Sequence, residues 1–300
     1  MKIWVAGHSG LVGSGLVSSI NDSAHTWVGL RSQDLDLTDA SKVRRFVDAE
    51  SPDVVVIAAA RVGGIWANKS RPYEFLKDNL ELELAVLGTC LEISHPKVVF
   101  LSSSCVYPKY SPQPIREEFM LKGELEETNK SYALAKIVGH RIVEIAVSQG
   151  LDWMTVLPTN VYGVEDNFDA QTSHVLPALV QKFVQAHSQN EQTVELWGDG
   201  TPLREFIHNR DLGDALLTIA TSERQKYNEI NVGTGHELSV SELADAIALE
   251  VGYTGHIHWR PDMPNGTPRK LLDSTRIREL GWKSRVSLQD GLSQVVSSRK

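Results

Sequence analysis

Two side chains of one predicted helix, Tyr132 and Lys136 in SYALAK, have the types and spacing for proton-transfer chemistry. Residues four apart share one face of a helix. A phenol ordinarily has a pKa near ~10, and a nearby ammonium favours the phenolate, so we expect Lys136 to lower the pKa of Tyr132. Such pairs are also common on helix surfaces, so the spacing alone leaves a solvated pair as the alternative.

Ser103 gives this pair a third partner, because it ends the apolar segment KVVFLSS that comes before the helix. Open α/β sheets present ligand-binding residues at the carboxyl ends of their strands. A serine hydroxyl at that place holds a carbonyl oxygen in line with the phenol. We predict that Ser103, Tyr132 and Lys136 polarise a carbonyl while a nicotinamide delivers hydride to its carbon.

Gly7, Gly10 and Gly13 follow the strand-like segment KIWVA as GxxGxxG. Glycines at this spacing let the backbone turn tightly and approach a pyrophosphate, which rests on the N-terminus of the next helix. The pattern at the start of an alternating α/β chain predicts dinucleotide binding. The alternative is a glycine turn that serves close packing of helix and strand.

Arg31 stands where a second strand ends, at Gly29-Leu30-Arg31. NAD sites usually carry an acidic residue there to bind the ribose hydroxyls, whereas the planar fork of an arginine suits a 2′-phosphate. NADP(H) is therefore the expected cofactor. Asp36 either reaches an adenine amine or serves as a neighbour of a helix N-cap.

These residues need a scaffold of strands and helices in alternation. Continuous β-branched runs between helix-period segments predict a parallel sheet covered on both faces, a Rossmann-like doubly wound α/β fold. The predicted strands are 2–7, 26–30, 53–60, 97–103 and 152–163. The predicted helices are 11–20, 38–50, 73–94 and 131–149.

The sequence pattern changes after residue 163. We therefore predict a cofactor domain over 1–163 and a mainly substrate-binding α/β domain over 164–300. Residues 206–235 are expected to return to the cofactor domain. Net charge is −8, which argues against nucleic-acid binding. Two cysteines make neither a disulfide framework nor a metal cluster. No signal peptide or membrane span is expected, so we predict a cytoplasmic location.

The Ser–Tyr–Lys set resembles the extended, nucleotide-sugar-modifying branch of the short-chain dehydrogenase/reductase superfamily. Within it, the chain resembles the GDP-L-fucose synthase family over residues 7 to about 282. The motifs that carry the resemblance are GHSGLVGSGL, AAARVGGIWAN, SSSCVYP, SYALAK, LPTNVYG, SHVLPAL, LWGDGTPLREFIH and GTPRKLLD. The resemblance implies 3,5-epimerisation and NADPH-dependent 4-keto reduction of GDP-4-dehydro-6-deoxy-D-mannose, and a homodimer through a four-helix bundle.

Cys105 and His174 match the base and acid of that epimerisation. The carbons on either side of a ketone are acidic because the carbanion is delocalised as an enolate. Inversion needs one group to remove a proton and another to return one to the opposite face. A free thiol near ~8.5 and an imidazole near ~6.5 both exchange protons easily at neutral pH. Without the resemblance, a small buried thiol and a loop histidine are the alternatives.

The resemblance also implies the binding residues. Substrate contacts are expected at Lys182, Trp197, Arg204, Asn265 and Lys270, and Asn79 and Asn160 are expected near the nicotinamide and the catalytic helix. The full set of expected cofactor contacts is Gly7, Ser9, Gly10, Leu11, Val12, Gly13, Arg31, Asp36, Ala59, Leu101, Ser102, Lys136, Pro158, Asn160, Val161 and His174. No metal is implied.

Three positions depart from the family pattern. Ser9 stands where many members have an arginine that supports the 2′-phosphate, which leaves Arg31 for that role. Arg61 replaces a frequent lysine, and Asn265 replaces an aspartate that is common before GTPRK.

Other activities of the same scaffold would require different residues at particular positions. A 4,6-dehydratase carries an Asp–Glu pair where this chain has Ser104 and Cys105. A 4-epimerase does not need Cys105 and His174 as a pair. GDP-L-colitose synthase performs the same two reactions on a 3-deoxy sugar, and nothing in the sequence separates it from the main interpretation. A non-enzymatic NADP-binding scaffold predicts a damaged Ser–Tyr–Lys set, but the set is intact.

Overall fold

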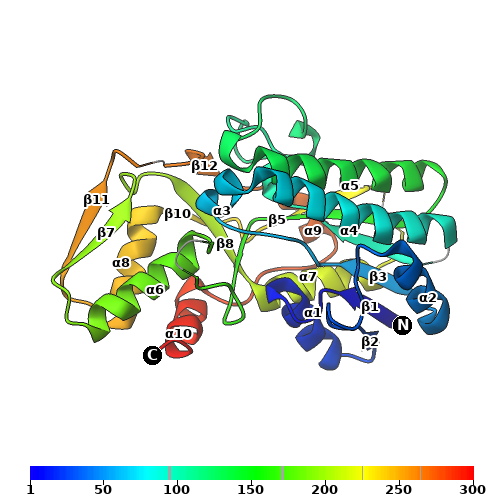
Figure 1. Cartoon of the computed structure of the whole chain (residues 1–300), viewed down its shortest axis with the longest axis horizontal. Helices are drawn as coiled ribbons and strands as arrows, with labels where there is room; N and C mark the ends of the chain where they lie inside the picture. The colour runs from blue at the N-terminus through cyan, green and yellow to red at the C-terminus, as the bar shows by residue number, and fades with distance from the viewer. Residues whose placement is uncertain (94–95, 170–171, 225, 264) are drawn as a thin grey trace.

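A six-stranded parallel sheet forms the larger lobe of the computed structural model, which describes residues 1–93, 96–169, 172–224, 226–263 and 265–300 (Figure 1). The strand order is β2-β1-β3-β4-β5-β9, and every pairing within it is parallel. The strands are β1 (Lys2–Ala6), β2 (Thr26–Val28), β3 (Val54–Ile57), β4 (Lys97–Leu101), β5 (Trp153–Pro158) and β9 (Glu229–Val232). The predicted Rossmann-like sheet is confirmed.

Helices cover both faces of this sheet, as its continuous apolar strands require. Alternate residues of β1 enter opposite cores, with Ile3 and Val5 on one face and Trp4 and Ala6 on the other. The first core is completed by α1 (Leu11–Asn21) and α7 (Asn209–Thr221). The second is completed by α2 (Ala40–Glu50), α4 (Pro72–Ile93) and α5 (Lys130–Ser148).

The helices begin where side chains can satisfy free backbone N–H groups. Asp39 accepts from the N–H groups of Ser41 and Lys42 at 3.0 and 3.1 Å at the start of α2. Helix α8 (Val240–Val251) starts with a capping box between Ser239 and Glu242. The predicted helix over 73–94 is observed as α4, and residue 94 lies outside the described residues.

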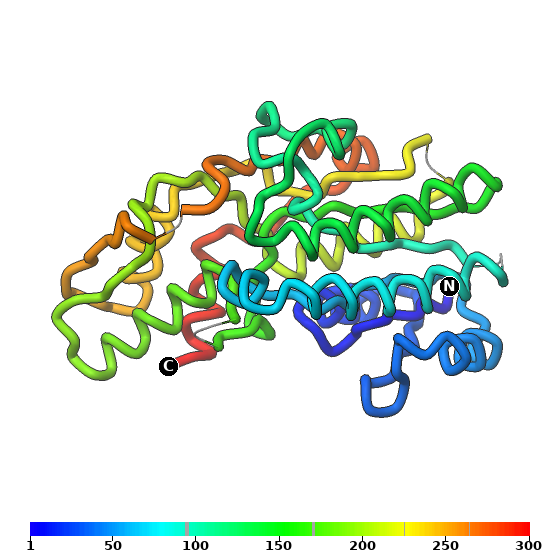
Figure 2. The backbone as a smooth tube through the Cα atoms, turned by 45° about the horizontal axis from the view of Figure 1, so that its top comes forward, coloured from blue at the N-terminus to red at the C-terminus, as the bar shows by residue number. Residues whose placement is uncertain are grey.

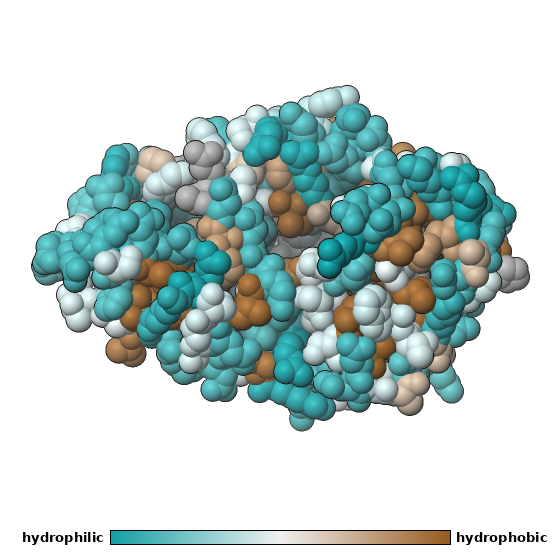
Figure 3. Space-filling view, turned by 60° about the horizontal axis from the view of Figure 1, so that its bottom comes forward, coloured by the Kyte–Doolittle hydropathy of each residue, from teal (hydrophilic) through white to brown (hydrophobic). Residues whose placement is uncertain are grey.

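The smaller lobe has its own apolar core. It lies among α6 (Val175–Ser188), α8, α10 (Leu288–Ser297) and the parallel strands β7 (Thr193–Trp197) and β11 (His256–Arg260). Four short strands lie where the two lobes meet: β6 (Asn160–Tyr162), β8 (Leu203–His208), β10 (Glu237–Ser239) and β12 (Arg269–Lys270). In a view with the bottom of Figure 1 turned forward, the surface is hollowed between the two lobes (Figure 3).

The chain passes between the lobes more than once. After β8 it returns to the large sheet through α7 and β9. Near the C-terminus Ile277, in α9 (Thr275–Glu279), and Trp282 again pack into the core beside α1 and α7. The division into domains over 1–163 and 164–300 stays a prediction. Among the described residues, no helix combines the length and apolar character that a membrane crossing requires.

Candidate active site

The segment SSSC turns sharply where β4 reaches the carboxyl edge of the sheet. A 3-10 turn, η1 (Ser104–Val106), follows Ser103 directly. The Ser103 hydroxyl oxygen accepts a hydrogen bond from the Cys105 N–H at 3.2 Å. The serine therefore fixes the start of the turn, and the turn holds Cys105 at the sheet edge.

Tyr132 and Lys136 lie one turn apart in α5, and both are buried. Burial, followed by the charges of Cys105 and Glu83, raises the pKa of Tyr132, while its hydrogen bond with Ser103 lowers it. The net effect is a phenol that stays protonated. This contradicts the expectation that Lys136 lowers the pKa of Tyr132. The main physical reason is burial of the phenol. In addition, the Lys136 ammonium pairs with the carboxylate of Glu83, at 3.0 Å from its Oε1.

The Cys105 sulfur faces two nitrogen donors from different parts of the chain. Asn129 Nδ2 donates to the sulfur at 3.2 Å, and Lys270 Nζ lies 3.9 Å from it. The sulfur is therefore held at the sheet edge between a neutral amide donor and a cation. By contrast, burial raises the pKa of Cys90 to about 12, so that cysteine is chemically inert.

Arg204 and Lys270 are neighbours on adjacent parallel strands, where Lys270 of β12 stands in register with Arg204 of β8. Burial lowers the pKa of Arg204 to about 10, while the charges of Cys105 and Glu126 oppose that shift. Two cations from the smaller lobe therefore lie close to the thiol of the larger one. Such a pair suits a diphosphate or an anionic intermediate.

His174 is the N-cap of α6, on a loop that packs against the glycines after β3. Gly64 N–H donates to Thr172 O at 2.8 Å, and a Cβ on Gly64 would lie 2.2 Å from Ser173 O. His174 is exposed to solvent, but the protein atoms around its ring still desolvate it in part. This desolvation and, second, the charge of Lys270 lower the pKa of His174. Lys270 is thus a shared neighbour of Cys105 and His174.

The glycine turn at the other end of the cleft has the form of a phosphate cradle. Gly7 has φ +93°, and a Cβ there would lie 2.7 Å from the backbone nitrogen of Ala59. A Cβ on Gly13 would lie 2.0 Å from Gly7 O. Gly10 caps α1 without a side chain, and the first turn of the helix holds no acidic residue. This end of α1 therefore fits the pyrophosphate of a dinucleotide.

Arg31 is exposed in the loop after β2, where its guanidinium fits a 2′-phosphate. Asp36 is also exposed, and its Oδ1 accepts from the N–H and hydroxyl of Thr38 at 3.0 and 2.7 Å. This favours the structural alternative for Asp36, as part of the turn before α2. The helix N-cap itself is Asp39.

The remaining expected cofactor contacts are spread along the sheet edge. Ser102 is buried, and its hydroxyl has no hydrogen-bond partner within the described ranges. Asn160 Nδ2 donates to Glu205 O at 2.7 Å, which ties β6 to β8. The other expected contacts lie in or beside the glycine turn, at the ends of β4 and β5, or in β6: Ser9, Leu11, Val12, Leu101, Pro158 and Val161.

Asn79 serves the scaffold. Its Oδ1 accepts from Arg61 N–H at 2.9 Å, and its Nδ2 donates to Arg61 O at 3.0 Å and to Phe75 O at 2.7 Å. The amide is thus occupied in holding the loop after β3 against α4. The Arg61 guanidinium forms an ion pair with Asp78 of the same helix.

Two expected substrate contacts lie in or near the turn that follows β7, and a third, Lys182, lies in α6 beside that strand. Lys182 Nζ donates to Glu195 O at 2.8 Å, and Trp197 at the end of β7 is 48% exposed. Asn265 Oδ1 accepts from Asp199 N–H at 3.0 Å, so it holds the turn through Gly198. No described contact joins Lys182 or Trp197 to Cys105, whereas Arg204 and Lys270 lie beside it.

Sequence reasoning missed three residues that shape the site: Glu83, Asn129 and Glu205. Glu205 is fully buried, and its two oxygens accept from Gly235 N–H at 2.6 Å and Leu272 N–H at 3.1 Å. Burial raises the pKa of its carboxyl group, and these hydrogen bonds oppose that rise. Glu205 therefore fixes the strands that carry Arg204 and Lys270. The one signal in the sequence was its place in the motif REF.

Comparison with known proteins agrees with this geometry. Residues 3–233 match the model of the NAD dependent epimerase/dehydratase family. The chain is 43% identical to GDP-L-fucose synthase 1 of Arabidopsis thaliana over 98% of its own length and 91% of that protein. It is 34% identical to GDP-L-colitose synthase of Yersinia pseudotuberculosis over 98% of its length and 96% of that protein.

A solved structure has the same fold over nearly the full length. It is a GDP-L-fucose synthetase from Naegleria fowleri bound to NADP, with a TM-score of 0.88 and 26% identity. The match covers 99% of this chain and 93% of that one.

Proposed function

The chain belongs to the NAD dependent epimerase/dehydratase family, and on that premise we propose that it converts GDP-4-dehydro-6-deoxy-D-mannose to GDP-L-fucose, using NADPH. One observation carries the proposal. The Cys105 sulfur lies between Asn129 and Lys270, on the turn that begins with Ser103, the hydrogen-bond partner of Tyr132. The thiol base, Cys105, therefore lies next to Ser103 and Tyr132, the pair that would bind the carbonyl oxygen.

Epimerisation comes first in this proposal. The Cys105 thiolate removes a proton from a carbon next to the C4 ketone, and the electron pair moves to the ketone oxygen as an enolate. Ser103 and Tyr132 donate hydrogen bonds to that oxygen. The His174 imidazolium then returns a proton to the opposite face of the carbon. Once Cys105 has released its proton to solvent and His174 has taken one up, the same exchange at the second carbon completes the 3,5-epimerisation. Lys270 stabilises the thiolate and favours release of the His174 proton.

Reduction uses the same oxygen site. Bound NADPH supplies a hydride to C4. Tyr132 gives its phenol proton to the oxygen, which becomes a hydroxyl, while Ser103 holds that oxygen in place. Burial keeps the phenol protonated until the hydride arrives. We assign Arg31 to the 2′-phosphate and the glycine turn of residues 7–13 to the pyrophosphate.

The GDP-sugar is proposed to lie across the hollow between the lobes. Arg204 and Lys270 bind the sugar or its diphosphate, and Trp197 and Lys182 contact the nucleoside end. Relatives named GDP-L-fucose synthase have higher identity than the colitose synthase, which favours the fucose product.

Turnover with purified GDP-4-dehydro-6-deoxy-D-mannose and NADPH tests this function. We expect loss of nicotinamide absorbance and a product whose NMR couplings are those of an L-fucosyl group. A folded, NADPH-binding protein that leaves the absorbance unchanged would refute the proposal. Faster turnover of the 3-deoxy substrate would assign it to colitose synthesis.

We further propose a cytoplasmic homodimer built on α4 and α5. The two helices lie side by side at the surface (Figure 2). Leu84 is 55% exposed in α4, and Leu134 and Val138 are 40% and 39% exposed one turn apart in α5. A Cβ on Gly88 would meet nothing within 4 Å, so another helix can approach closely there. A second copy of this face completes a four-helix bundle.

Light scattering on the purified chain measures its mass in solution. We expect twice the chain mass for wild type and a shift to monomer for Leu84→Glu/Val138→Glu. A monomeric wild type at micromolar concentration would refute the dimer.

A further inference from the structure

Glu83 is a fully buried carboxylate in the middle of α4, where α4 packs against α5. The packing is close because α5 has a glycine at this point. A Cβ on Gly139 would lie 2.7 Å from Glu83 Oε2 and 2.4 Å from Phe100 Cζ. Gly139 therefore leaves just enough room for the Glu83 carboxylate between the two helices.

Lys136 is the single cation that contacts Glu83 among the described residues. Its Nζ lies 3.0 Å from Glu83 Oε1 and donates to Leu101 O at 3.1 Å. The same nitrogen is 4.8 Å from the centre of the Phe100 ring and 5.9 Å from that of Tyr132. The ammonium is therefore in direct contact with Glu83 and also lies over the rings of Phe100 and Tyr132.

The buried Glu83–Lys136 pair is not expected to add much to the stability of the fold. Burying an ion pair often costs more than its attraction returns, and apolar replacements of similar volume are frequently as stable. Neither Glu83 oxygen has a hydrogen bond of good geometry within the described part of the chain. Retaining two such charges next to Tyr132 points to a role in the chemistry.

We propose that Glu83 is the fixed counter-ion of Lys136 and that it controls how much of the ammonium charge reaches the Tyr132 hydroxyl. The inference rests on the proposed function, in which Tyr132 gives the proton during reduction. Glu83 touches neither substrate nor cofactor, so it is a positioning residue. With Glu83 ionised, Tyr132 stays a protonated donor at neutral pH.

The charged groups around Tyr132 are few. Glu83 faces it from α4, Cys105 from η1 and Lys136 from α5 itself, and Lys270 lies beyond the Cys105 sulfur. Arg61, in the loop after β3, is already paired with Asp78. Removing the negative charge of Glu83 therefore leaves the Lys136 ammonium to act on the phenol. The Tyr132–Lys136 pair must then lose its first proton at a lower pH.

The test compares Glu83→Gln with wild type, in the NADPH-dependent reduction followed across pH. We expect the alkaline limb of kcat to move down by at least about one pH unit, the effect of one nearby charge on a buried group. Glu83→Asp keeps the charge and should keep the limb of wild type. Asp211→Asn is the matched control, because Asp211 is a buried carboxylate that accepts from Arg285 and Val286 N–H groups, and it should also leave the limb in place. An unmoved limb in folded Glu83→Gln overturns the inference.

A second measurement needs no substrate. Carbon-13 tyrosine NMR follows the Tyr132 ring, with its signal assigned by Tyr132→Phe. If the Tyr132 ring titrates at a lower pH in Glu83→Gln than in wild type, the inference is supported even if wild type turns out to have another substrate. An unchanged titration counts against it. If Glu83→Gln does not fold, Glu83→Gln/Lys136→Met removes both charges. Recovery of the folded circular dichroism spectrum supports the counter-ion role, and failure to recover contradicts it.

Discussion

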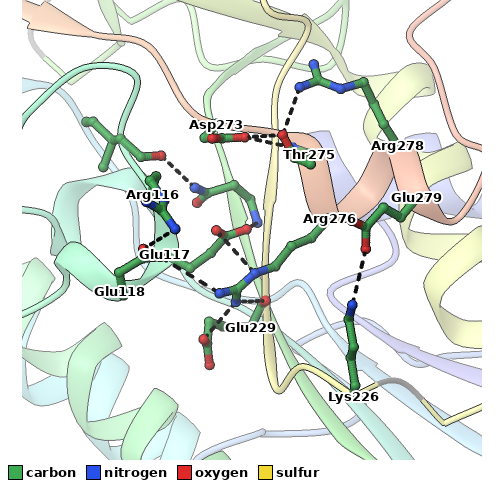
Figure 4. Close-up of polar contacts among 12 residues, drawn as sticks. Arg116, Glu117, Glu118, Lys226, Glu229, Asp273, Thr275, Arg276, Arg278 and Glu279 are labelled. Atoms are coloured by element: carbon green, nitrogen blue, oxygen red, sulfur yellow. Dashed lines mark hydrogen bonds and ion pairs between the residues drawn. The ribbon is translucent and has the colours of Figure 1, made fainter.

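Arg276 in α9 and Lys136 in α5 are both largely enclosed by protein, but their partners differ in number and kind. Arg276 Nη1 donates to the carbonyl of Glu229 at 2.9 Å and to its Oε1 at 2.8 Å, and its Nε lies 3.4 Å from Glu117 Oε2 (Figure 4). Its guanidinium also stacks 4.3 Å from the Tyr227 ring. Lys136 has one carboxylate and one carbonyl as polar partners, and the rings of Phe100 and Tyr132 as its aromatic neighbours.

The Arg276 cluster fastens three segments to one another. Asn231 of β9 donates its N–H to Glu117 Oε1 and its Nδ2 to Ile115 O, both at 2.9 Å, and accepts from the Tyr107 hydroxyl at 2.6 Å. The segment after Cys105, strand β9 and α9 are thereby joined, with almost every polar atom in use. Saturation of this kind stabilises a fold. The comparison suggests that the sparsely partnered cation is the one whose charge is available for chemistry.

Removing one phenol hydroxyl from each region should give the largest difference between the catalytic edge and the Arg276 cluster. Tyr132→Phe should abolish reduction, by about 100-fold or more, because the proton donor to the ketone oxygen is lost. Tyr107→Phe removes another buried hydroxyl, from the Arg276 cluster, and should lower the melting temperature while turnover persists. Nicotinamide oxidation and circular dichroism melting measure the two effects. Near wild-type turnover in Tyr132→Phe would break the comparison.

Cys105→Ser tests the thiol at the catalytic edge. We expect epimerisation to stall, by about 100-fold, because serine is a much weaker base at neutral pH, and hydride to go to the unepimerised ketone instead. Product stereochemistry by NMR reads this outcome. Cys90→Ala is the control, since Cys90 is fully buried with its pKa raised to about 12 and has no part in the reaction. L-sugar formed at the normal rate by Cys105→Ser would exclude it as the base.

Arg276→Met examines the saturated cluster. The change leaves Glu117 buried without its cation, so the free energy of unfolding should fall by about 3 kcal/mol, as found when one partner of a buried pair is removed. The turnover of the protein that remains folded should be unchanged. Urea denaturation measures the loss. Lys226→Met removes the exposed partner of Glu279 in the same region and should have little effect; equal losses in both variants would contradict the assignment.

The sheet and the Ser–Tyr–Lys spacing were predictable because both are local patterns. A continuous apolar run such as DVVVIAAA predicts a buried strand, and residues four apart in a helix must share a face. Glu83 was not predictable, because LELEL resembles a solvated helix face until α5 is packed against it. Asn129 was missed for a similar reason, since its contact with Cys105 joins residues 24 apart.

The interpretation of two residues changed because the structure gives their polar atoms other partners. Asp36 bonds to Thr38 two residues away, and Asn265 bonds to Asp199 across 66 positions. The expected effect of Lys136 on Tyr132 was wrong because the sequence shows neither how deeply the phenol is buried nor which anion is nearest to the ammonium. Long-range pairing of charges is therefore the part of this site that only coordinates reveal.

Lys270 offers the smallest and most specific test, because it is a second cation with few partners. Desolvation is the larger cause of the lowered pKa of His174 and the charge of Lys270 the smaller one, so Lys270→Met should raise that pKa only in part. Histidine NMR titration measures the shift. Arg269→Met is the matched control, since Arg269 bonds to Glu237 and is not among the causes of the His174 shift.

The direction of the His174 pKa shift also predicts how the stability of the fold changes with pH. A histidine whose folded pKa is lowered stabilises the fold above its unfolded value, near ~6.5, and that contribution is lost as pH falls through the folded pKa. Lys270→Met should therefore lose less stability than wild type on acidification below this range. If the His174 titration and the acid limb of stability are both unchanged in Lys270→Met, the lysine does not act on the imidazole. The contrast between sparsely and fully partnered cations would then apply to Lys136 alone.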